Sequence, residues 1–256
     1  MPTGMFLPRR LDRAFSRLAA GAGADNLKSL LALQGNPEYY SWYDDFLGDS
    51  AGTWPASANY GYPATVGTGT EVITLEPLEG GVLQLVTGAN ANDSAGQAVG
   101  LHWLGDSSFY FAARIQLDTL ASSIIEVGLK DTVTGDTGAV ATKATPTFTN
   151  TVCACFVRDT TDDVNLTFVS NGGTADANAD WPGTFNAAQY YFVEIVGSGP
   201  TSATGDNVTG FINGQRVGSG NIDGAVLLTP YFYVETLTAA TRQMRVDYGI
   251  CVGKRS

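Results

Sequence analysis

The chain is poor in the residues on which cross-linking and metal binding most often depend. Its 256 residues include three cysteines and one histidine. Three cysteines are too few for a disulfide scaffold, and their odd number leaves at least one thiol free. A single histidine argues against a zinc site. These shortages fit a protein made in a reducing cytoplasm, and we expect no cofactor.

Long apolar runs are also absent. No run approaches the ~20 residues that cross a membrane as a helix, so we expect no membrane partner. Arg9 and Arg10 precede a small-residue stretch, LAAGAGA, as in a twin-arginine export signal. That stretch is only about seven residues long and weakly apolar, at the lower limit for a signal core. We therefore expect that this segment is not cleaved.

Negative charge dominates the chain, but it is unevenly distributed. The formal net charge is −11. Residues 1–37 hold five basic and two acidic side chains, a balance of +3, whereas the rest holds nine basic and 23 acidic ones, a balance of −14. An acidic body repels phosphate groups, so we expect no nucleic-acid binding by this larger part. The basic segment suits contact with an acidic protein surface, with nucleic acid as a weaker alternative.

Helical patterns are confined to this basic segment. Over residues 9–21, Leu11, Phe15 and Leu18 recur at helical spacing while the arginines take another face. A second helical pattern spans residues 26–34 and is followed by Gly35. An aromatic connector, NPEYYSWYDDF, comes next. We predict a short basic helical arm with its connector over residues 1–43 and a globular domain over residues 44–256.

Two short amphipathic helices cannot bury their apolar faces alone, so the arm should dock on something. It either packs on its own domain or anchors the chain to a neighbouring subunit, and the sequence leaves both open. The residues expected to make this contact are basic, apolar or aromatic: Arg9, Arg10, Arg13, Phe15, Arg17, Leu18, Tyr39, Tyr40 and Trp42.

From Asp44 onward, apolar and polar residues alternate with a period of two, which is typical of half-buried strands. The pattern predicts strands over residues 71–77, 81–87, 97–103, 108–117, 123–130, 150–158, 164–170, 189–197, 225–235 and 243–252. Asn213-Gly214 is the strongest local hairpin signal. Strands with no helix between them predict one all-β domain, an antiparallel two-sheet jelly-roll sandwich.

The strand series resembles the concanavalin A-like, laminin-G-like jelly rolls of tailed-phage virion proteins. The resemblance covers most of the chain and is carried by residues 44–49, 100–117, 125–131, 211–218 and 228–252. It implies a capsid decoration, head-fibre or other appendage protein. Lectins and glucanases share the strand pattern. The N-terminal arm lies outside the shared region, so anchoring by the arm is our own inference.

Because the same architecture hosts glycoside hydrolases, the strand carboxylates are candidate catalytic groups. Retaining hydrolases of this fold place acids in an E-x-D-x-x-E string, so that two carboxylates flank one bond at about 5 Å. The chain has no such string, and its nearest candidates are Glu126 with Asp131, Glu194 and Glu235. Each glutamate stands alone in its strand, so we expect no enzymatic activity.

Other candidate sites are weaker. His102 would need a serine and an acid from elsewhere to form a triad, and we expect a packed histidine instead. The acidic stretches 159–165 and 174–180 offer the oxygens that calcium prefers, but neither has EF-hand spacing, so calcium is a minor alternative. The candidate platforms for stacking a sugar ring lie in turn-rich stretches: Trp54, Tyr60 and Trp181.

We therefore expect a structural protein of a tailed-phage virion, namely a capsid decoration (cement) protein on the capsid exterior, made in the host bacterial cytoplasm. Its partners would be the major capsid protein or another virion protein. It would also bind further copies of itself, with a trimer favoured. The alternative is a carbohydrate-binding module of a head or tail fibre, and an active glycoside hydrolase is the third and least favoured hypothesis.

Overall fold

The computed structural model describes residues 39–44, 46, 72–76, 81–105, 107–133, 137–143, 145–150, 152–162, 164–172, 175–199, 205–222 and 226–254. Every regular element in these ranges is a β-strand. None of the described segments is an apolar helix long enough to cross a membrane. The expected all-β antiparallel sandwich is thus confirmed, whereas the helices expected at 9–21 and 26–34 lie outside the described residues.

The period-two pattern produces strands with one buried face. In β6 (Ser108–Leu117) the odd-numbered residues from Phe109 to Leu117 are buried, whereas Tyr110, Arg114 and Gln116 are partly exposed. Successive side chains point to opposite faces of a strand, so one face enters the core. β6 has the bounds that its sequence pattern predicts.

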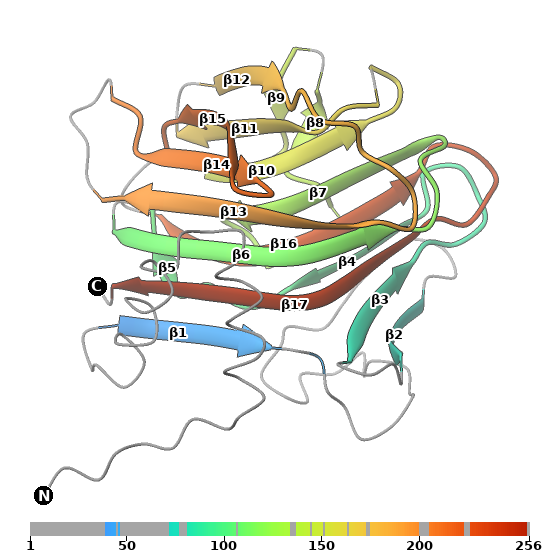
Figure 1. Ribbon diagram of the computed structural model, residues 1–256, viewed down its shortest axis with the longest axis horizontal. Helices are drawn as coiled ribbons and strands as arrows, with labels where there is room; N and C mark the ends of the chain where they lie inside the picture. The colour runs from blue at the N-terminus through green and yellow to red at the C-terminus, as the bar shows by residue number, and fades with distance from the viewer. Residues whose placement is uncertain are drawn as a thin grey trace, which may run out of the picture.

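The first sheet, sheet A, has eight strands (Figure 1). Its order is β15 (Gln215–Gly220), β14 (Val208–Ile212), β13 (Tyr190–Ser198), β6, β17 (Gln243–Lys254), β3 (Val82–Val86) and β2 (Val72–Glu76), and β1 (Tyr39–Asp44) also pairs with β17. β17 is long enough to pair with β3 through its first residues and with β1 through its last ones.

The second sheet, sheet B, has seven strands. Its order is β12 (Ala175–Asp180), β11 (Thr167–Gly172), β10 (Val152–Asp159), β7 (Ser123–Lys130), β16 (Leu227–Thr236) and β4 (Ser94–Ala98), and β5 (Trp103–Leu104) also pairs with β16. Two further strands, β8 (Val140–Thr142) and β9 (Thr147–Phe148), form a separate two-stranded sheet. Every pairing in the three sheets is antiparallel.

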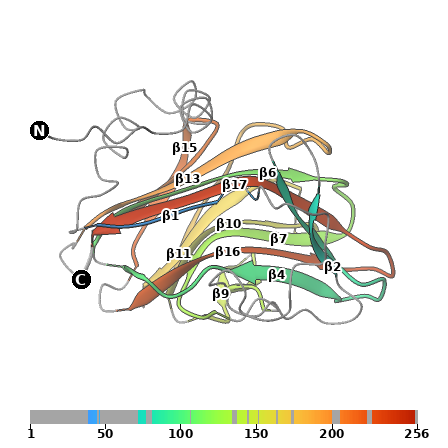
Figure 2. The same ribbon diagram turned by 90° about the horizontal axis from the view of Figure 1, so that it is seen from below.

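The main core lies between the two sheets, which Figure 2 shows edge-on as two facing layers. Phe111 of sheet A approaches Phe232 of sheet B with 6.4 Å between ring centroids. Phe168 packs so closely on β14 that a Cβ at Gly210 would lie 2.4 Å from its ring. Each fully buried side chain of this size contributes about 1.5–3 kcal/mol, so this core is the main source of stability.

A second apolar cluster covers the outer face of sheet B. It contains Cys153, Cys155 and Tyr231, together with Val140 of β8 and the preceding residue Ala139. Sheet B is therefore buried on both faces over part of its area. Figure 2 shows β9 on the side of sheet B that faces away from sheet A.

The structure moves the predicted domain boundary. Residues 39–43 are not a connector outside the sandwich, because Tyr39–Asp44 form β1 and pair with β17 from Tyr39↔Lys254 to Asp44↔Gly249. Trp42 packs against the core, and a Cβ at Gly249 would lie 2.5 Å from its indole. The sandwich thus includes Tyr39–Asp44, and the aromatic side chains of Tyr40 and Trp42 are part of it.

One other expectation needs correction, one strand was not predicted, and one expectation is confirmed. The single strand expected at 97–103 is divided into β4 and β5, because the amides of Val99 and Gly100 bond to the Thr229 hydroxyl. Much of the acidic stretch 174–180, which lies outside the predicted strand ranges, is the edge strand β12. The hairpin at Asn213-Gly214 is confirmed, and both residues have the positive φ angles that its turn requires.

The place of β1 in the sandwich predicts the effect of a substitution. Trp42→Ala should lower the free energy of unfolding by about 2–4 kcal/mol, because it removes an indole that packs against the core. Ser41→Ala is the matched control, since Ser41 is exposed in the same strand and should change stability by less than about 0.5 kcal/mol. Urea unfolding followed by circular dichroism measures both, and equal stabilities would show that β1 is not part of the sandwich.

Candidate functional site

The candidate carboxylates lie on the outer faces of the two sheets. Glu126 of β7 and Glu235 of β16 project from the outer face of sheet B, because their neighbours Val127 and Val234 enter the core. Glu194 of β13 projects from the outer face of sheet A. The structure therefore does not gather the three glutamates into one site.

Glu126 is fully buried, and its carboxylate is hydrogen-bonded by neighbouring groups of the protein. Its carboxylate accepts hydrogen bonds from the backbone amides of Ala139 at 2.6 Å and Val140 at 3.1 Å, and from the Tyr231 hydroxyl at 2.7 Å. Burial raises the pKa of this carboxyl group, whereas the three hydrogen bonds and the nearby Lys130 act in the opposite direction. The carboxylate holds protein groups in place and is closed to a substrate.

The groups above Glu126 belong to the β8–β9 hairpin, which we define as residues 137–143 and 145–150. Gly138 lies directly on the carboxylate, and a Cβ there would be 2.4 Å from Oε1. Lys130, also fully buried, donates from Nζ to the Thr137 carbonyl at 2.6 Å and lies 4.7 Å from the centre of the Tyr231 ring. Two charged groups of β7 thus face the same hairpin.

Asp131, the predicted neighbour of Glu126, is held separately. Its Oδ1 accepts from the Asn150 side chain at 2.5 Å and its Oδ2 from the Val152 amide at 3.0 Å. Both donors are backbone or amide groups at the end of the hairpin and the start of β10. Asp131 therefore fixes the chain where it enters β10, and the structure does not pair it with Glu126.

The other two glutamates each accept a hydrogen bond from a tyrosine. Tyr110 donates to Glu194 Oε1 at 2.7 Å, and Tyr233 donates to Glu235 Oε2 at 2.6 Å. Burial raises the pKa of Glu194 and of Glu235, and the phenol bonds partly offset that rise. With Glu126 and Tyr231, this makes three Glu–Tyr pairs. Such pairs satisfy a half-buried carboxyl group without a substrate.

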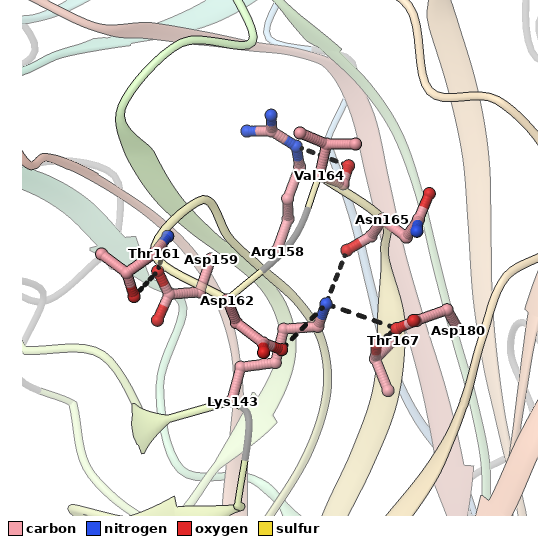
Figure 3. Close-up of polar contacts among 9 residues, drawn as sticks. All are labelled: Lys143, Arg158, Asp159, Thr161, Asp162, Val164, Asn165, Thr167 and Asp180. Carbon is pink, nitrogen blue, oxygen red and sulfur yellow. Dashed lines mark hydrogen bonds and ion pairs between the residues drawn. The ribbon is translucent and has the colours of Figure 1, made fainter.

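The two acidic stretches considered for calcium do meet in space, but a lysine lies between them (Figure 3). Lys143 Nζ is 3.1 Å from the Asn165 carbonyl, 3.6 Å from Asp162 Oδ2 and 3.3 Å from Asp180 Oδ1. Its side chain is 2% exposed. Thr167 also donates to Asp180. The ammonium supplies the positive charge that these oxygens would otherwise lack.

The rest of the stretch 159–165 is fixed by internal bonds. Asp159 Oδ1 accepts from both the amide and the hydroxyl of Thr161, at 2.8 and 2.7 Å. The fully buried Arg158 donates to the Val164 carbonyl at 2.9 Å and to the Leu120 carbonyl. Among the described residues, no group of three or more His, Cys, Asp or Glu side chains is placed to hold a metal ion.

The structure places the predicted aromatic residues in different environments. Trp181 is 7% exposed, packs edge-on against Tyr191 at 5.7 Å and donates from Nε1 to Gln215 at 3.2 Å. The indole belongs to the core, so it has no free face for a sugar, and this corrects the sequence-based expectation. Tyr40 lies over the exposed His102 with 4.6 Å between ring centroids. His102 is therefore packed against an aromatic ring, and the partial desolvation of its imidazole lowers its pKa.

Several predicted residues lie outside the described part of the chain. They are Trp54 and Tyr60 of the glycan hypothesis and Arg9, Arg10, Arg13, Phe15, Arg17 and Leu18 of the arm. For Tyr39, the structure describes the strand pairing and not the side chain. Residues 48–52, Gly-Asp-Ser-Ala-Gly, also match the nucleophile-elbow pattern G-x-S-x-G. This stretch lies outside the described residues.

No protein-family model matches the chain, and no curated protein matches it by sequence. Solved structures do match its fold. A protein of unknown function from Shewanella oneidensis MR-1 is 13% identical, with a TM-score of 0.57 over 100% of this chain and 98% of that one. The endo-1,3-β-glucanase of Streptomyces sioyaensis is 11% identical, with a TM-score of 0.56 over 86% of this chain and 98% of that one.

Peanut lectin is a third similar structure, with 12% identity and a TM-score of 0.54 over 85% of this chain and 98% of that one. At these identities the likeness concerns the fold alone. The chain therefore has a lectin-like, concanavalin A-like jelly-roll fold. One such fold hosts lectins and a glucanase, so function must be argued from the residues.

The Glu194–Tyr110 pair predicts a pH-dependent effect. Burial raises the pKa of Glu194 in the folded protein. The folded wild-type protein therefore binds a proton at Glu194 more tightly than the unfolded chain does. The contribution of Glu194 to stability is then present below its unfolded pKa and is lost as the pH rises through its folded pKa. Glu194→Gln should therefore gain stability relative to wild type as the pH rises above 4.5, the ordinary pKa of a glutamate.

Urea unfolding at a series of pH values measures this difference. Tyr110→Phe is the matched variant, because it removes the phenol bond that lowers the pKa of Glu194. It should make the loss of stability with rising pH larger than in wild type. A Glu194→Gln difference that is constant across this range would refute the assigned pKa direction.

Proposed function

We propose that this chain is a non-catalytic structural protein of a tailed-phage particle, in particular a capsid decoration protein that displays a lectin-like sandwich. The observation that supports it best is the use of the strand glutamates: Glu126, Glu194 and Glu235 each accept a bond from a tyrosine. The sandwich therefore uses its candidate acids to hold itself together. The assignment to a phage particle itself rests on the strand series in the sequence.

The position of β1 supports attachment through the N-terminal segment. Tyr39 pairs with Lys254, so the basic segment that precedes Tyr39 joins the sandwich beside the last residues of β17. Residues 1–37 carry a balance of +3 against −14 for the rest of the chain. Opposite charges steer association and fix its orientation. The proposed partner is an acidic surface of the major capsid protein or another virion protein.

The remaining parts of the proposal concern assembly and location. The protein would sit on the capsid exterior as a closed symmetric oligomer, with a trimer favoured. It would be made in the host bacterial cytoplasm, and it would need no cofactor. Lys143 already supplies the cation between the two acidic stretches, which is consistent with that last point.

The arm hypothesis predicts a specific loss of attachment. Purified virions should contain the protein by mass spectrometry, because a decoration protein stays with the particle. The full chain with Arg9→Gln, Arg10→Gln, Arg13→Gln and Arg17→Gln should bind undecorated shells at least about tenfold more weakly, and wild-type binding should weaken with salt. Arg216→Gln is the matched control, since Arg216 is an exposed cation of the sandwich. Virions without the protein, or equal binding by the fourfold variant, would contradict the proposal.

A carbohydrate-binding module of a head or tail fibre is the second candidate, and the lectin-like fold favours it. The predicted platforms Trp54 and Tyr60 remain candidates, whereas the burial of Trp181 removes the third. A shallow site of this kind needs a stacking ring and a few convergent polar groups.

A glycan array separates this candidate from a purely structural protein. If it binds sugars, wild type should give saturable binding that Trp54→Ala or Tyr60→Ala reduces at least about tenfold, because each removes a stacking ring. Trp181→Ala is unsuitable as a probe, because loss of a core indole lowers stability. No signal above background, with and without calcium, would eliminate the sugar-binding candidate.

A further inference from the structure

The β8–β9 hairpin is held on the sandwich in an unusual way. Its two strands pair with each other, at Val140↔Phe148 and Thr142↔Thr147, and form a sheet separate from sheets A and B. No ladder in the described residues joins it to the strands beneath. The hairpin can therefore leave the sandwich without breaking any strand pairing of the two main sheets.

Polar contacts fasten the hairpin at its base. Glu126 accepts from the amides of Ala139 and Val140, and Lys130 donates to the Thr137 carbonyl. Apolar contact adds to this, because Ala139 and Val140 are buried against the outer face of sheet B. These contacts lie on residues 137–140, before the turn of the hairpin. On the return side, the Asn150 side chain donates to Asp131 and Thr132.

Lys143 fastens the hairpin at its turn. It follows β8 directly, and its ammonium reaches Asp162, beyond the end of β10, and Asp180, at the end of β12 (Figure 3). These acids are 29% and 41% exposed, so the ion pairs lie at the edge of the protein although the lysine itself is buried. Lys143 thus fixes the turn of the hairpin to the rim of sheet B.

Three of the groups that hold the hairpin are buried charges, namely Glu126, Lys130 and Lys143. Their burial lowers the free energy needed to lift the hairpin. A buried ion loses hydration, and its partners only partly compensate for that loss. When the hairpin lifts, Glu126, Lys130 and Lys143 regain water, so hydration offsets part of the lost contacts. The inter-sheet core is not exposed by this movement.

We propose that the β8–β9 hairpin is a lid that opens as a unit under native conditions, with Lys143 as its latch. Opening uncovers Tyr231, Cys153 and Cys155 on the outer face of sheet B while the sandwich stays folded. Local openings of this kind require less free energy than global unfolding when they break few contacts. The proposal does not depend on the function assigned above.

The three cysteines are natural reporters of this movement. Cys153 and Cys155 are buried beneath the lid, whereas Cys251 is buried in the core between the sheets. Burial raises the pKa of the Cys251 thiol, and a hydrogen bond with Cys155 together with burial raises the pKa of the Cys153 thiol. All three thiols are buried, so a reagent can reach them only after they are uncovered.

Timed alkylation with N-ethylmaleimide, read by peptide mass spectrometry, distinguishes the two kinds of opening. In wild type without denaturant, Cys153 and Cys155 should be labelled at least about tenfold faster than Cys251, because the lid opens more often than the sandwich unfolds. Low urea should accelerate Cys251 more steeply, because global unfolding exposes more surface. Equal rates with equal urea dependence for all three cysteines would overturn the proposal.

The full chain with Lys143→Met tests the latch. Labelling of Cys153 and Cys155 should accelerate by at least about tenfold relative to Cys251, since the acids lose their cation. Trp42→Ala is the contrasting variant. Trp42 lies opposite Cys251 in the pairing of β1 with β17, so its loss should accelerate Cys251 and leave the lid cysteines less affected. An unchanged ratio of rates in Lys143→Met would show that Lys143 is not the latch.

Discussion

A charge can remain in a protein interior only if its neighbours supply hydrogen bonds or an opposite charge, and this constraint shapes one whole face of the sandwich. Glu126 and Lys130 stand on the central strand β7 and are both fully buried. Backbone groups of the β8–β9 hairpin satisfy both of them. The hairpin must therefore lie where it does, and the outer face of sheet B is closed above these two residues.

The same constraint explains why the fold does not determine the function here. Sandwiches of this shape include a glucanase and a lectin, so the architecture can present carboxylates to a substrate. In this chain Glu126, Glu194 and Glu235 each accept a hydrogen bond from a tyrosine instead. Glu235 has a raised pKa, as catalytic acids often do, but buried structural pairs produce the same signature. Burial of the Glu235 side chain is the main cause of this raised pKa, and the hydrogen bond from Tyr233 partly offsets it.

Much of the fold could be predicted from the sequence, because a strand with one buried face has alternating apolar and polar residues. β6 and β7 have the bounds that the pattern predicts. Strands that carry few apolar residues gave no such signal: β12 reads Ala-Asp-Ala-Asn-Ala-Asp and is held by pairing with β11. β1 was missed because its aromatic residues resemble an interface segment, and only the register with β17 assigns them to the sandwich.

The polar sites were less predictable, because the partner of a charge is chosen by the fold and not by nearness in sequence. The acids of 159–165 and 174–180 suggested a bound metal ion, yet the cation beside Asp162 and Asp180 is Lys143, which precedes both stretches. An ammonium and a divalent ion satisfy the same oxygens, but only the ammonium is covalently attached to a movable hairpin. A tethered cation couples the position of its own chain segment to the acids, which a free ion cannot do. The acidic rim of sheet B thereby acts on the lid above it, and this coupling follows from burial and geometry that the sequence alone did not reveal.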